Sequence, residues 1–399
     1  MKNKAYITLM VAQAISSIGD WLSIVAILTM VGMKWNATPI EVSLVILCLS
    51  VPMALLGPIA GTVADRFSRK ALMVTSDLVR AGLIIVLAMA ETLWMVYICL
   101  LAIGAFSAVF VPAKNGKLKE LIVDEQMKSA MSITSMIDSG TKVMGPLVSG
   151  MLVTAFGSKL VFYIDSLTFI LSALLLLFLP KAMNIVIENS ADVQVTKPSF
   201  KTEFKEGISF IKSNRYMLVG MFFLGSSLLV LQLADSQIVV LLRELTTASP
   251  DVFGYLVTAS GIGMFMAGLI LTKKTDYKAF PLMLIGTTGI GLSFGVMAIF
   301  TSYDLPWSII WGPFLGLTAG FSASFIFVPF QASVQVETPS HMTGRVFGVI
   351  NSVTTTATIF GPLLGGWLAI VIGVVPTFII SASLLVVLAF IGLVMKRII

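Results

Sequence analysis

Seven ionisable side chains stand inside long apolar stretches of this sequence. They are Asp20, Asp77, Arg80, Asp138, Lys142, Asp165 and Asp235. An ionisable group in such surroundings is unfavourable unless it is paired or hydrated, so each is a candidate for binding a proton or a ligand. Asp20 lies roughly 22 Å along its stretch if that stretch is helical, close to the middle. We expect Asp20 to titrate or to bind a cationic ligand; the alternative is a hydrogen bond to a neighbouring helix.

The other acidic candidates differ in what lies near them in the sequence. Asp138 and Lys142 are four residues apart and therefore share one helix face. They form an ion pair that is either permanent or opens when Asp138 accepts a proton or a ligand displaces one member. Asp165 and Asp235 lie toward the outer ends of their stretches. Each is a candidate for coupling to protons or is simply hydrated or caps a neighbouring helix.

Asp77 and Arg80 are three residues apart, so they also share a helix face. They lie one to two helical turns from a basic loop that precedes them. We expect both side chains to extend the polar network of that loop rather than to bind a substrate.

The composition indicates that these residues lie in a membrane. Of 399 residues, 57% are hydrophobic and 12% are charged, compared with roughly a quarter charged in soluble domains. Apolar runs of about 20 residues, the length that crosses a bilayer, recur from end to end, and the alternation typical of a membrane barrel is absent. The sequence therefore predicts an all-α integral membrane protein.

The sequence contains few residues suited to enzymatic catalysis. One histidine, His341, and two cysteines, Cys48 and Cys99, form no obvious metal cluster, and no Ser/His/Asp set can be assembled. We expect His341 in a surface loop and both cysteines as small side chains facing lipid or core. No Gly-x-x-x-x-Gly-Lys-Ser/Thr loop for ATP occurs. We therefore predict a protein that is not an enzyme and holds no metal or cofactor.

The apolar runs predict twelve transmembrane helices, near residues 5–33, 41–63, 70–91, 93–113, 128–156, 160–180, 216–241, 251–272, 281–301, 307–330, 344–371 and 374–395. With both termini in the cytoplasm, 21 of the 26 basic residues fall in inner segments and three in outer segments. This asymmetry sets the orientation. It also indicates that the formal charge of +6 reflects membrane topology rather than nucleic-acid binding. The apolar run after Lys4 is too long for a signal-peptide core, so we expect it to remain as the first span.

Segments near the end of each half of the chain repeat one another at a constant offset. The segment GPLVSG at Gly145–Gly150 returns as GPLLGG at Gly361–Gly366, and Gly157 returns as Gly373, each 216 positions later. Duplication of this kind builds transporters from two six-helix halves, with the substrate cavity near the bilayer midplane. Chance recurrence of Gly-Pro patterns is the alternative. The predicted parts are an N-terminal half at residues 1–180, a cytoplasmic linker at 181–215 and a C-terminal half at 216–399.

The loop between the second and third spans reads GTVADRFSRKAL, Gly61 to Leu72. It resembles the cytoplasmic signature of the major facilitator superfamily, Gly-x-x-x-Asp-Arg-x-Gly-Arg-Lys, with Ser68 at the second glycine. The resemblance implies a latch in which the Asp65 carboxylate pairs with the other half in one state, and we expect its partner near Arg345. A plain basic turn is the alternative. The predicted latch comprises Gly61, Asp65, Arg66, Arg69, Lys70, Asp77, Arg80 and Arg345.

The fifth span carries DSGTKVMGPLVSG, Asp138 to Gly150. It resembles the Gly-Pro signature of the superfamily's antiporter branch, which implies export in exchange for protons. Glycines let a neighbouring helix approach and proline kinks the span, so the segment suits a sliding interface. Helix packing without a coupling role is the alternative. The motif residues in both halves are Gly140, Gly145, Pro146, Gly150, Gly361, Pro362 and Gly366.

Two further segments, VFVPAKNGKLKELI after the fourth span and FYIDSLTFILSALLL in the sixth, resemble the drug-export branch that contains macrolide efflux proteins and the enterobactin exporter. The Pro-Ala-Lys segment is also similar to the lysophospholipid transporter. The chain departs from many of these exporters in the fourth span, where residues 98–110 contain no arginine. Their coupling scheme is therefore not transferred to this chain.

The sequence thus predicts a secondary active transporter that exports amphipathic or lipophilic, macrolide-like small molecules by proton antiport and alternating access. Its 26 Phe and 22 Met residues suit a soft apolar cavity, and the proton gradient supplies the energy. The expected partners are the substrate, protons and membrane lipid, and the resemblance implies a monomer in the plasma membrane. The alternatives are a lysophospholipid or siderophore transporter of the same fold, and a non-transporting sensor or scaffold.

Overall fold

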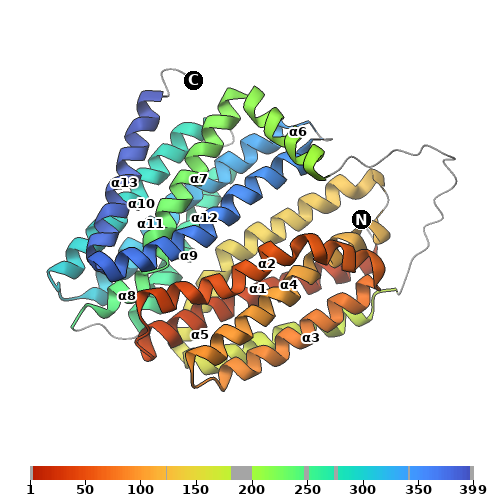
Figure 1. The fold of residues 1–399 in the computed structure, drawn as a ribbon, viewed down its shortest axis with the longest axis horizontal. Coiled ribbons are helices and arrows are strands. Elements are labelled where there is room, and N and C mark those ends of the chain that lie inside the picture. The colour runs from red at the N-terminus through yellow and green to blue at the C-terminus, as the bar shows by residue number, and fades with distance from the viewer. Residues whose placement is uncertain are drawn as a thin grey trace. The chain divides into compact units, whose positions relative to one another are not determined.

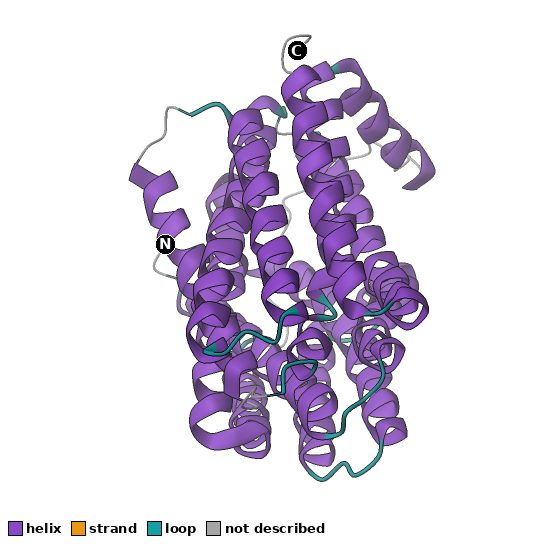
Figure 2. Cartoon of the chain, turned by 90° about the vertical axis from the view of Figure 1, so that its left-hand side faces the viewer, coloured by secondary structure: helices purple, strands orange, loops and turns teal. Residues whose placement is uncertain are grey.

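The computed structural model describes residues 3–122, 124–180, 200–246, 251–273, 277–339 and 342–395. Within these ranges the regular elements are helices and none is a strand, as the colouring of Figure 2 shows. Eleven helical stretches among the described residues are long and apolar enough to cross a membrane. The chain is therefore an all-α, multi-pass membrane protein.

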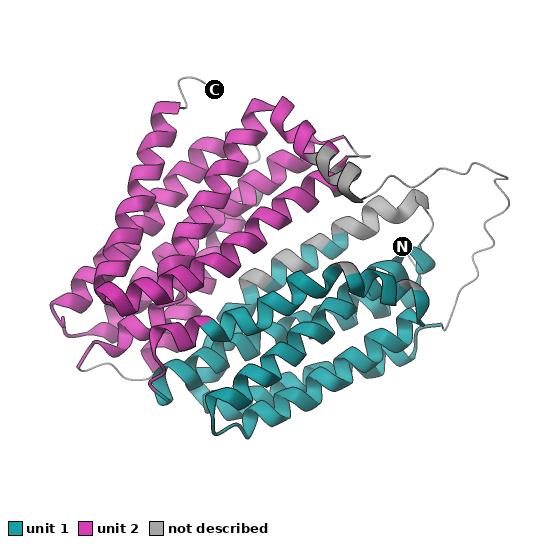
Figure 3. Ribbon diagram, in the orientation of Figure 1, with its two compact units in different colours: residues 1–35, 44–192 teal, residues 36–43, 193–399 magenta. Residues whose placement is uncertain are grey.

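The first of two compact units consists of residues 1–35 and 44–192 (Figure 3). Its helices are α1 (Lys4–Leu28), the short π-helix η1 (Thr29–Lys34) that continues α1, α2 (Pro39–Arg66), α3 (Arg69–Ala88), α4 (Leu93–Leu121) and α5 (Asp124–Leu177). Helix α1 packs along α5, and α3 packs against both α4 and α5. Helix α5 contains two spans because the chain turns at Gly157, whose φ of 76° lies in the left-handed region that glycine adopts without strain.

The second unit consists of residues 193–399 together with residues 36–43, which include the first turn of α2. Its helices are α6 (Phe200–Ser213), α7 (Arg215–Asp235), α8 (Ile238–Arg243), α9 (Asp251–Lys273), α10 (Ala279–Ser302), α11 (Ser308–Glu337), α12 (Thr343–Ile372) and α13 (Val374–Met395). In Figure 1 these helices run from green to blue, and α7 lies beside α12 and α13. Helices α7 and α8 together form one apolar stretch of 29 residues.

The observed helices correspond to the twelve predicted spans once α5 is divided at Gly157, but two regions differ from the prediction. Helix α4 continues to Leu121, beyond the predicted end at residue 113, because its lysines are paired; Lys117, for example, is buried against Glu120 and the carbonyl of Pro180. Helix α6 falls within the predicted linker. The remainder of that linker up to residue 199 lies outside the described ranges.

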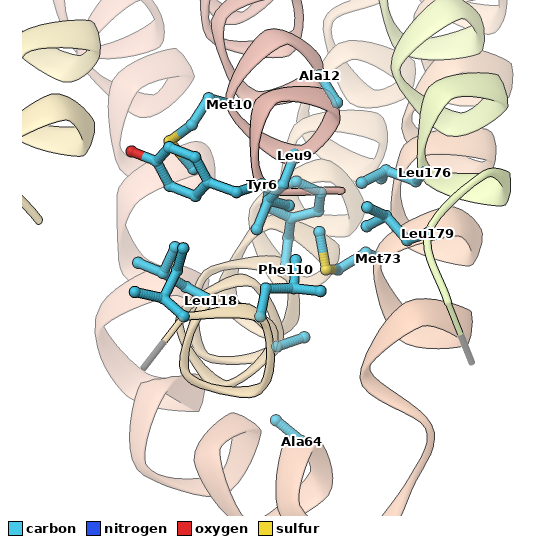
Figure 4. Close-up of a cluster of buried hydrophobic side chains, with 13 residues drawn as sticks. Tyr6, Leu9, Met10, Ala12, Ala64, Met73, Phe110, Leu118, Leu176 and Leu179 are labelled. Atoms are coloured by element: carbon cyan, nitrogen blue, oxygen red, sulfur yellow. The ribbon is translucent and has the colours of Figure 1, made fainter. Parts of the chain in front are cut away.

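Thirteen buried apolar residues form a core in the first unit (Figure 4). Tyr6 and Leu9 of α1 meet Phe110 of α4 and Leu176 of α5 in this cluster. Lipid is as apolar as these side chains, so such a core holds membrane helices together through close van der Waals packing rather than through hydrophobic exclusion from water. The cluster therefore fixes α1 against the helices that carry the remaining site residues.

The start of α1 is also tied to the end of α4. Asn3 caps α1 by accepting a hydrogen bond of 3.0 Å from the backbone N–H of Ala5, and its Nδ2 donates to the carbonyl of Leu121 at 2.8 Å. A capping side chain satisfies backbone donors that have no partner within the helix. These bonds set the position of α1, and with it the position of Asp20 further along the helix.

Candidate functional site

Helix α3 carries a buried ion network centred on Arg80. The Arg80 guanidinium pairs with the Asp77 carboxylate, which also accepts a hydrogen bond of 2.6 Å from Ser172 Oγ on α5. The guanidinium carbon lies 4.3 Å from the ring centroid of Phe169 and 4.8 Å from that of Phe110. The side chains of Arg80 and Asp77 are 3% and 0% exposed. An ion pair and two aromatic faces therefore hold the guanidinium in place.

Asp20 of α1 lies at the accessible end of this network. Its Oδ1 is 3.5 Å from Arg80 Nη1, on the guanidinium that Asp77 already pairs, and its side chain is 47% exposed. From the sequence, Asp77 and Arg80 are expected to extend the network of the basic loop. In the structure they join Asp20 instead, because this face of α3 packs inside the helix bundle. Two carboxylates thus share one guanidinium, and of the two only Asp20 is accessible.

Asp165, on the second span of α5, is completely buried beside α1. Ser23 of α1 donates a hydrogen bond to one of its carboxylate oxygens, and Thr168 donates to the other at 3.3 Å. A Cβ atom on Gly19 would lie 2.3 Å from Asp165 Oδ1, so α1 can approach this closely only with glycine at that position. Asp165 therefore links α1 to the second span of α5 through a hydrogen bond.

The break between α7 and α8 places Asp235 at the surface and Gln237 in the interior. Gln237 Nε2 donates hydrogen bonds to Ser43 Oγ at 2.9 Å and to the carbonyl of Pro39 at 3.2 Å. Ser43 Oγ donates in turn to the carbonyl of Pro362 at 2.6 Å. A polar cluster within the second unit thus holds the first turn of α2, and Gln237 rather than Asp235 is its central residue.

The two copies of the Gly-Pro segment pack in equivalent ways. A Cβ on Gly145 of α5 would lie 2.5 Å from Trp21 Cγ on α1, and a Cβ on Gly361 of α12 would lie 2.4 Å from Gln232 Cβ on α7. Each glycine therefore lets its helix contact the first span of its own half closely. The prolines that follow these glycines inside the helices are Pro146 and Pro362.

The other glycines of this motif have different surroundings. A Cβ on Gly366 would lie 2.4 Å from Ser43 Oγ, so the absence of a side chain makes room for the first turn of α2. Gly150 is buried, whereas Gly140 has open space where a Cβ would point. Close helix packing therefore involves only part of the motif.

The basic loop between α2 and α3 makes contacts within the first unit. Arg69 Nη1 donates hydrogen bonds of 3.0 Å to Glu120 Oε1 and to the carbonyl of Gly116, both on α4. Lys117 donates to Glu120 Oε2 at 2.6 Å and to the carbonyl of Pro180 at 2.8 Å. Glu120, which the sequence motifs did not single out, thus joins the loop to α4. The spacing of Lys117 and Glu120, three residues apart on one helix face, is the signal that identifies it.

Two other basic residues of the predicted latch contact different elements. Lys70 Nζ donates hydrogen bonds of 2.6 Å to the carbonyls of Leu177 and Leu179, so it covers the end of α5. Arg345, the expected partner of the loop, pairs instead with Glu206 in the second unit. The sequence does not indicate this pair, because Glu206 lies on α6, which is not among the predicted spans.

Some predicted site residues are described only in part. The side chains that lie outside the described part of the structure are those of Asp65, Asp138 and Lys142, whose backbones belong to α2 and α5. His341 lies outside the described ranges altogether. Arg66 is exposed, and Gly61 has open space where a Cβ would point. The pairing of Asp65 with the other half and the ion pair of Asp138 with Lys142 stay predictions.

Each unit carries an apolar groove. In the first unit a groove of about 430 Å³ runs between α1 and α5, where Tyr6, Met10 and Ile137 contribute to its lining. In the second unit a groove of about 310 Å³ runs between α9 and α11, past Tyr255 and Ile262. Apolar concavities with few polar groups suit hydrophobic ligands.

Comparison with known proteins matches residues 9–361 to the Major Facilitator Superfamily. The chain is 36% identical to the uncharacterized MFS-type transporter YfiS of Bacillus subtilis (strain 168), over 99% of this chain and 94% of that protein. It is 23% identical to macrolide efflux protein A of Streptococcus pyogenes, over 97% of this chain and 94% of that protein. It is 22% identical to multidrug resistance protein MdtG of Proteus mirabilis (strain HI4320), over 83% of this chain and 79% of that protein.

Solved structures share the fold at low sequence identity. The nucleoside transporter NupG matches with a TM-score of 0.72 and 15% identity over 99% of each chain. A bacterial homologue of the human lysosomal transporter Spinster, in an inward-facing and unoccupied conformation, matches with a TM-score of 0.69 and 14% identity over 100% of this chain and 98% of that chain. Family match and fold agree, and the chain belongs to the Major Facilitator Superfamily, as a multi-pass membrane transporter rather than an enzyme.

Proposed function

We propose that this transporter exports amphipathic or lipophilic small molecules in exchange for protons, and that Asp20 is the residue that carries the proton. The observation that supports the proposal is the accessible Asp20 carboxylate at the end of an otherwise buried network. Asp77 pairs the same guanidinium from the interior. The contact of Asp20 with Arg80 can therefore break without leaving a buried charge unpaired, which would be strongly unfavourable.

Protonation of Asp20 removes its charge and its attraction to Arg80, while Asp77 keeps the guanidinium paired. A transporter couples two fluxes when its two access states bind the proton with different affinities. Movement of α1 relative to α3 changes the distance between Asp20 and Arg80, and this distance sets how strongly Asp20 holds a proton. Alternating access then carries the proton inward and the substrate outward.

The proposed substrate class rests on two kinds of support. The grooves along α1 and α9 are lined mainly by apolar residues, including Met10, whose flexible thioether adapts to ligands of different shape. Two relatives are named for macrolide efflux and for multidrug resistance.

We propose that the proton gradient and the membrane potential supply the energy without a cofactor. One elementary charge crossing 100 mV is worth roughly 2.3 kcal/mol.

We place the transporter in the plasma membrane as a monomer with both termini in the cytoplasm. The distribution of the basic residues supports this orientation, because 21 of 26 fall in the segments that it makes cytoplasmic.

Uptake into inside-out membrane vesicles tests the proposal. We expect the wild type to accumulate fluorescent amphiphiles only while a pH gradient is present, and an ionophore to abolish the accumulation. Asp20→Asn should lose gradient-driven uptake because the amide cannot accept the proton. Glu91→Gln, which changes an exposed acidic residue between α3 and α4, is the matched control and should behave as the wild type.

Two outcomes would contradict the proposal. Accumulation of an amphiphile that is unaffected by the ionophore would exclude proton antiport. Movement of a lysophospholipid without a gradient, and of no other compound, would favour a lipid transporter of the same fold.

A further inference from the structure

A cavity of about 540 Å³ lies in the second unit, between the first turns of α7 and α10 and the last turns of α11. It is larger than either groove described above, and it contains none of the residues of the Arg80 network. Phe280, Pro281 and Pro329 form apolar parts of its wall. Two oppositely charged residues, Lys278 and Glu337, also line it. The cavity therefore offers one apolar surface and one charge of each sign.

The Glu337 carboxylate is held by two neutral donors. Ser333 Oγ donates a hydrogen bond to its Oε1 at 3.2 Å, and Asn214 Nδ2 donates to its Oε2 at 2.9 Å. Neither donor carries a positive charge. The two bonds fix the orientation of the carboxylate and leave its negative charge available to a cationic ligand.

Lys278 immediately precedes α10 and is exposed. It forms no ion pair with the acidic side chains that the structure describes. Beside it, the Tyr216 hydroxyl accepts a hydrogen bond of 3.2 Å from the backbone N–H of Phe280, so its own proton remains available for donation. An ammonium group and a phenolic hydroxyl are suitable donors to a phosphate oxygen.

We propose that this cavity binds an aminophospholipid of the surrounding membrane, such as phosphatidylethanolamine. Its ammonium group contacts Glu337, its phosphate contacts Lys278 and Tyr216, and an acyl chain lies along the apolar wall. The headgroup matches the cavity because it joins one positive and one negative group. A primary ammonium donates hydrogen bonds to a carboxylate, whereas the quaternary ammonium of choline has no hydrogen to donate. The proposal does not depend on the proposed transport function.

Simpler ligands fit the cavity less well. A free phosphate ion would be repelled by Glu337, and an inorganic cation would be repelled by Lys278. A wholly apolar molecule would cover both charged groups without pairing either of them, which is unfavourable. A zwitterion with an apolar tail pairs both charges and packs its tail against the apolar wall of the cavity.

Lipid retention by the full-length protein tests the proposal. The protein is reconstituted in vesicles of equal parts phosphatidylethanolamine, phosphatidylglycerol and phosphatidylcholine and extracted in detergent, and the bound lipids are counted by native mass spectrometry. We expect the wild type to retain phosphatidylethanolamine at least about tenfold more often than phosphatidylcholine, the size expected for one charge-assisted hydrogen bond.

Two variants test which residue contacts the ammonium group of the headgroup and which contacts its phosphate. Glu337→Gln should remove the preference for phosphatidylethanolamine over phosphatidylcholine, and its amide oxygen preserves an acceptor for the neighbouring donors. Lys278→Gln, at an exposed position that leaves folding unchanged, should lower retention of all three lipids. Lys212→Gln, an exposed change on α6, is the control and should retain lipids as the wild type does.

Three results would overturn the proposal. The first is equal retention of the three lipids by the wild type. The second is an unchanged preference for phosphatidylethanolamine in Glu337→Gln together with unchanged lipid retention in Lys278→Gln. The third comes from a second preparation of vesicles that also contains lysophosphatidylethanolamine: retention of this lysolipid without retention of the diacyl lipid would identify the cavity as a site for a transported solute instead of a membrane lipid.

Discussion

Gly157 and Gly373 adopt the same unusual backbone conformation, although 216 positions separate them. Their φ and ψ angles are 76° and 166° at Gly157 and 92° and 158° at Gly373. Gly157 lies between the two spans of α5, and Gly373 lies between α12 and α13. Only glycine adopts this region of φ and ψ without strain. The duplication in the sequence therefore extends to the turns that connect the last two spans of each half.

Alanine at either turn should destabilise the protein. We expect Gly157→Ala and Gly373→Ala each to lower the free energy of unfolding by about 1–3 kcal/mol, because a Cβ is strained at these angles. Thermal unfolding in detergent measures the effect. Gly82→Ala is the matched control, since Gly82 lies within α3 and has no atom within 4 Å of a new Cβ. An equal loss of stability in all three variants would contradict this explanation.

The spans and the turns between them follow from the sequence, because they depend on the lengths of the apolar runs and on the positions of glycines. Apolar length sets each span, and the repeated glycines mark both turns. The C-terminal end of α4 and the position of α6 do not follow from the sequence, because they depend on partners elsewhere in the chain. Lys117 extends α4 only because the Pro180 carbonyl and Glu120 pair it.

The site was predictable only in part. The spacing of Asp77 and Arg80 indicates that they share a face, but it does not indicate which helices that face meets. Within its transmembrane span the partner helix α4 is apolar on all sides, and such a helix shows no preferred orientation in its sequence pattern. The contacts of Arg80 with Phe110 on α4 and Phe169 on α5 were therefore not foreseen. The sequence identifies both Asp20 and Arg80 as candidates, but it does not indicate that they are partners.

Removal of the Arg80 charge should be costly because Asp77 is completely buried. We expect Arg80→Met to lower the free energy of unfolding by about 3–5 kcal/mol. The double variant Arg80→Met/Asp77→Asn should recover a large part of this loss, since it removes the unpaired charge as well. Melting temperatures of the single and double variants in detergent provide the comparison. A double variant less stable than Arg80→Met would show that the pair is not the origin of the effect.

A side chain at residue 19 should separate α1 from α5. A Cβ there would lie 2.2 Å from Thr168 Oγ1 and 2.3 Å from Asp165 Oδ1. We expect Gly19→Ala to lower stability by about 1–3 kcal/mol, the range of overpacked interiors. Gly57→Ala, with no atom within 4 Å of its new Cβ, serves as the control in the same unfolding assay. Unchanged stability of Gly19→Ala would contradict the close packing of these helices.

Loss of Glu120 should lower stability more than loss of Lys117, because Glu120 pairs with both Arg69 and Lys117. Glu120→Ala leaves the buried Lys117 ammonium without its carboxylate, whereas Lys117→Met removes the charge and keeps much of the side-chain volume. We expect Glu120→Ala to be less stable than Lys117→Met by about 1–3 kcal/mol. Lys119→Met, at an exposed position on the same helix, is the control. The opposite order of stability would mean that Glu120 does not hold this network together.

Substrate-driven proton movement tests the central claim most directly. Purified protein is reconstituted in liposomes that contain a pH-sensitive dye, and an amphiphile that is transported in the vesicle assay is added outside. In the wild type, we predict that entry of the amphiphile drives protons out and raises the internal pH. In Asp20→Asn, the pH should stay constant while exchange of labelled for unlabelled amphiphile continues. Substrate-driven proton movement at the wild-type rate in Asp20→Asn would contradict the account.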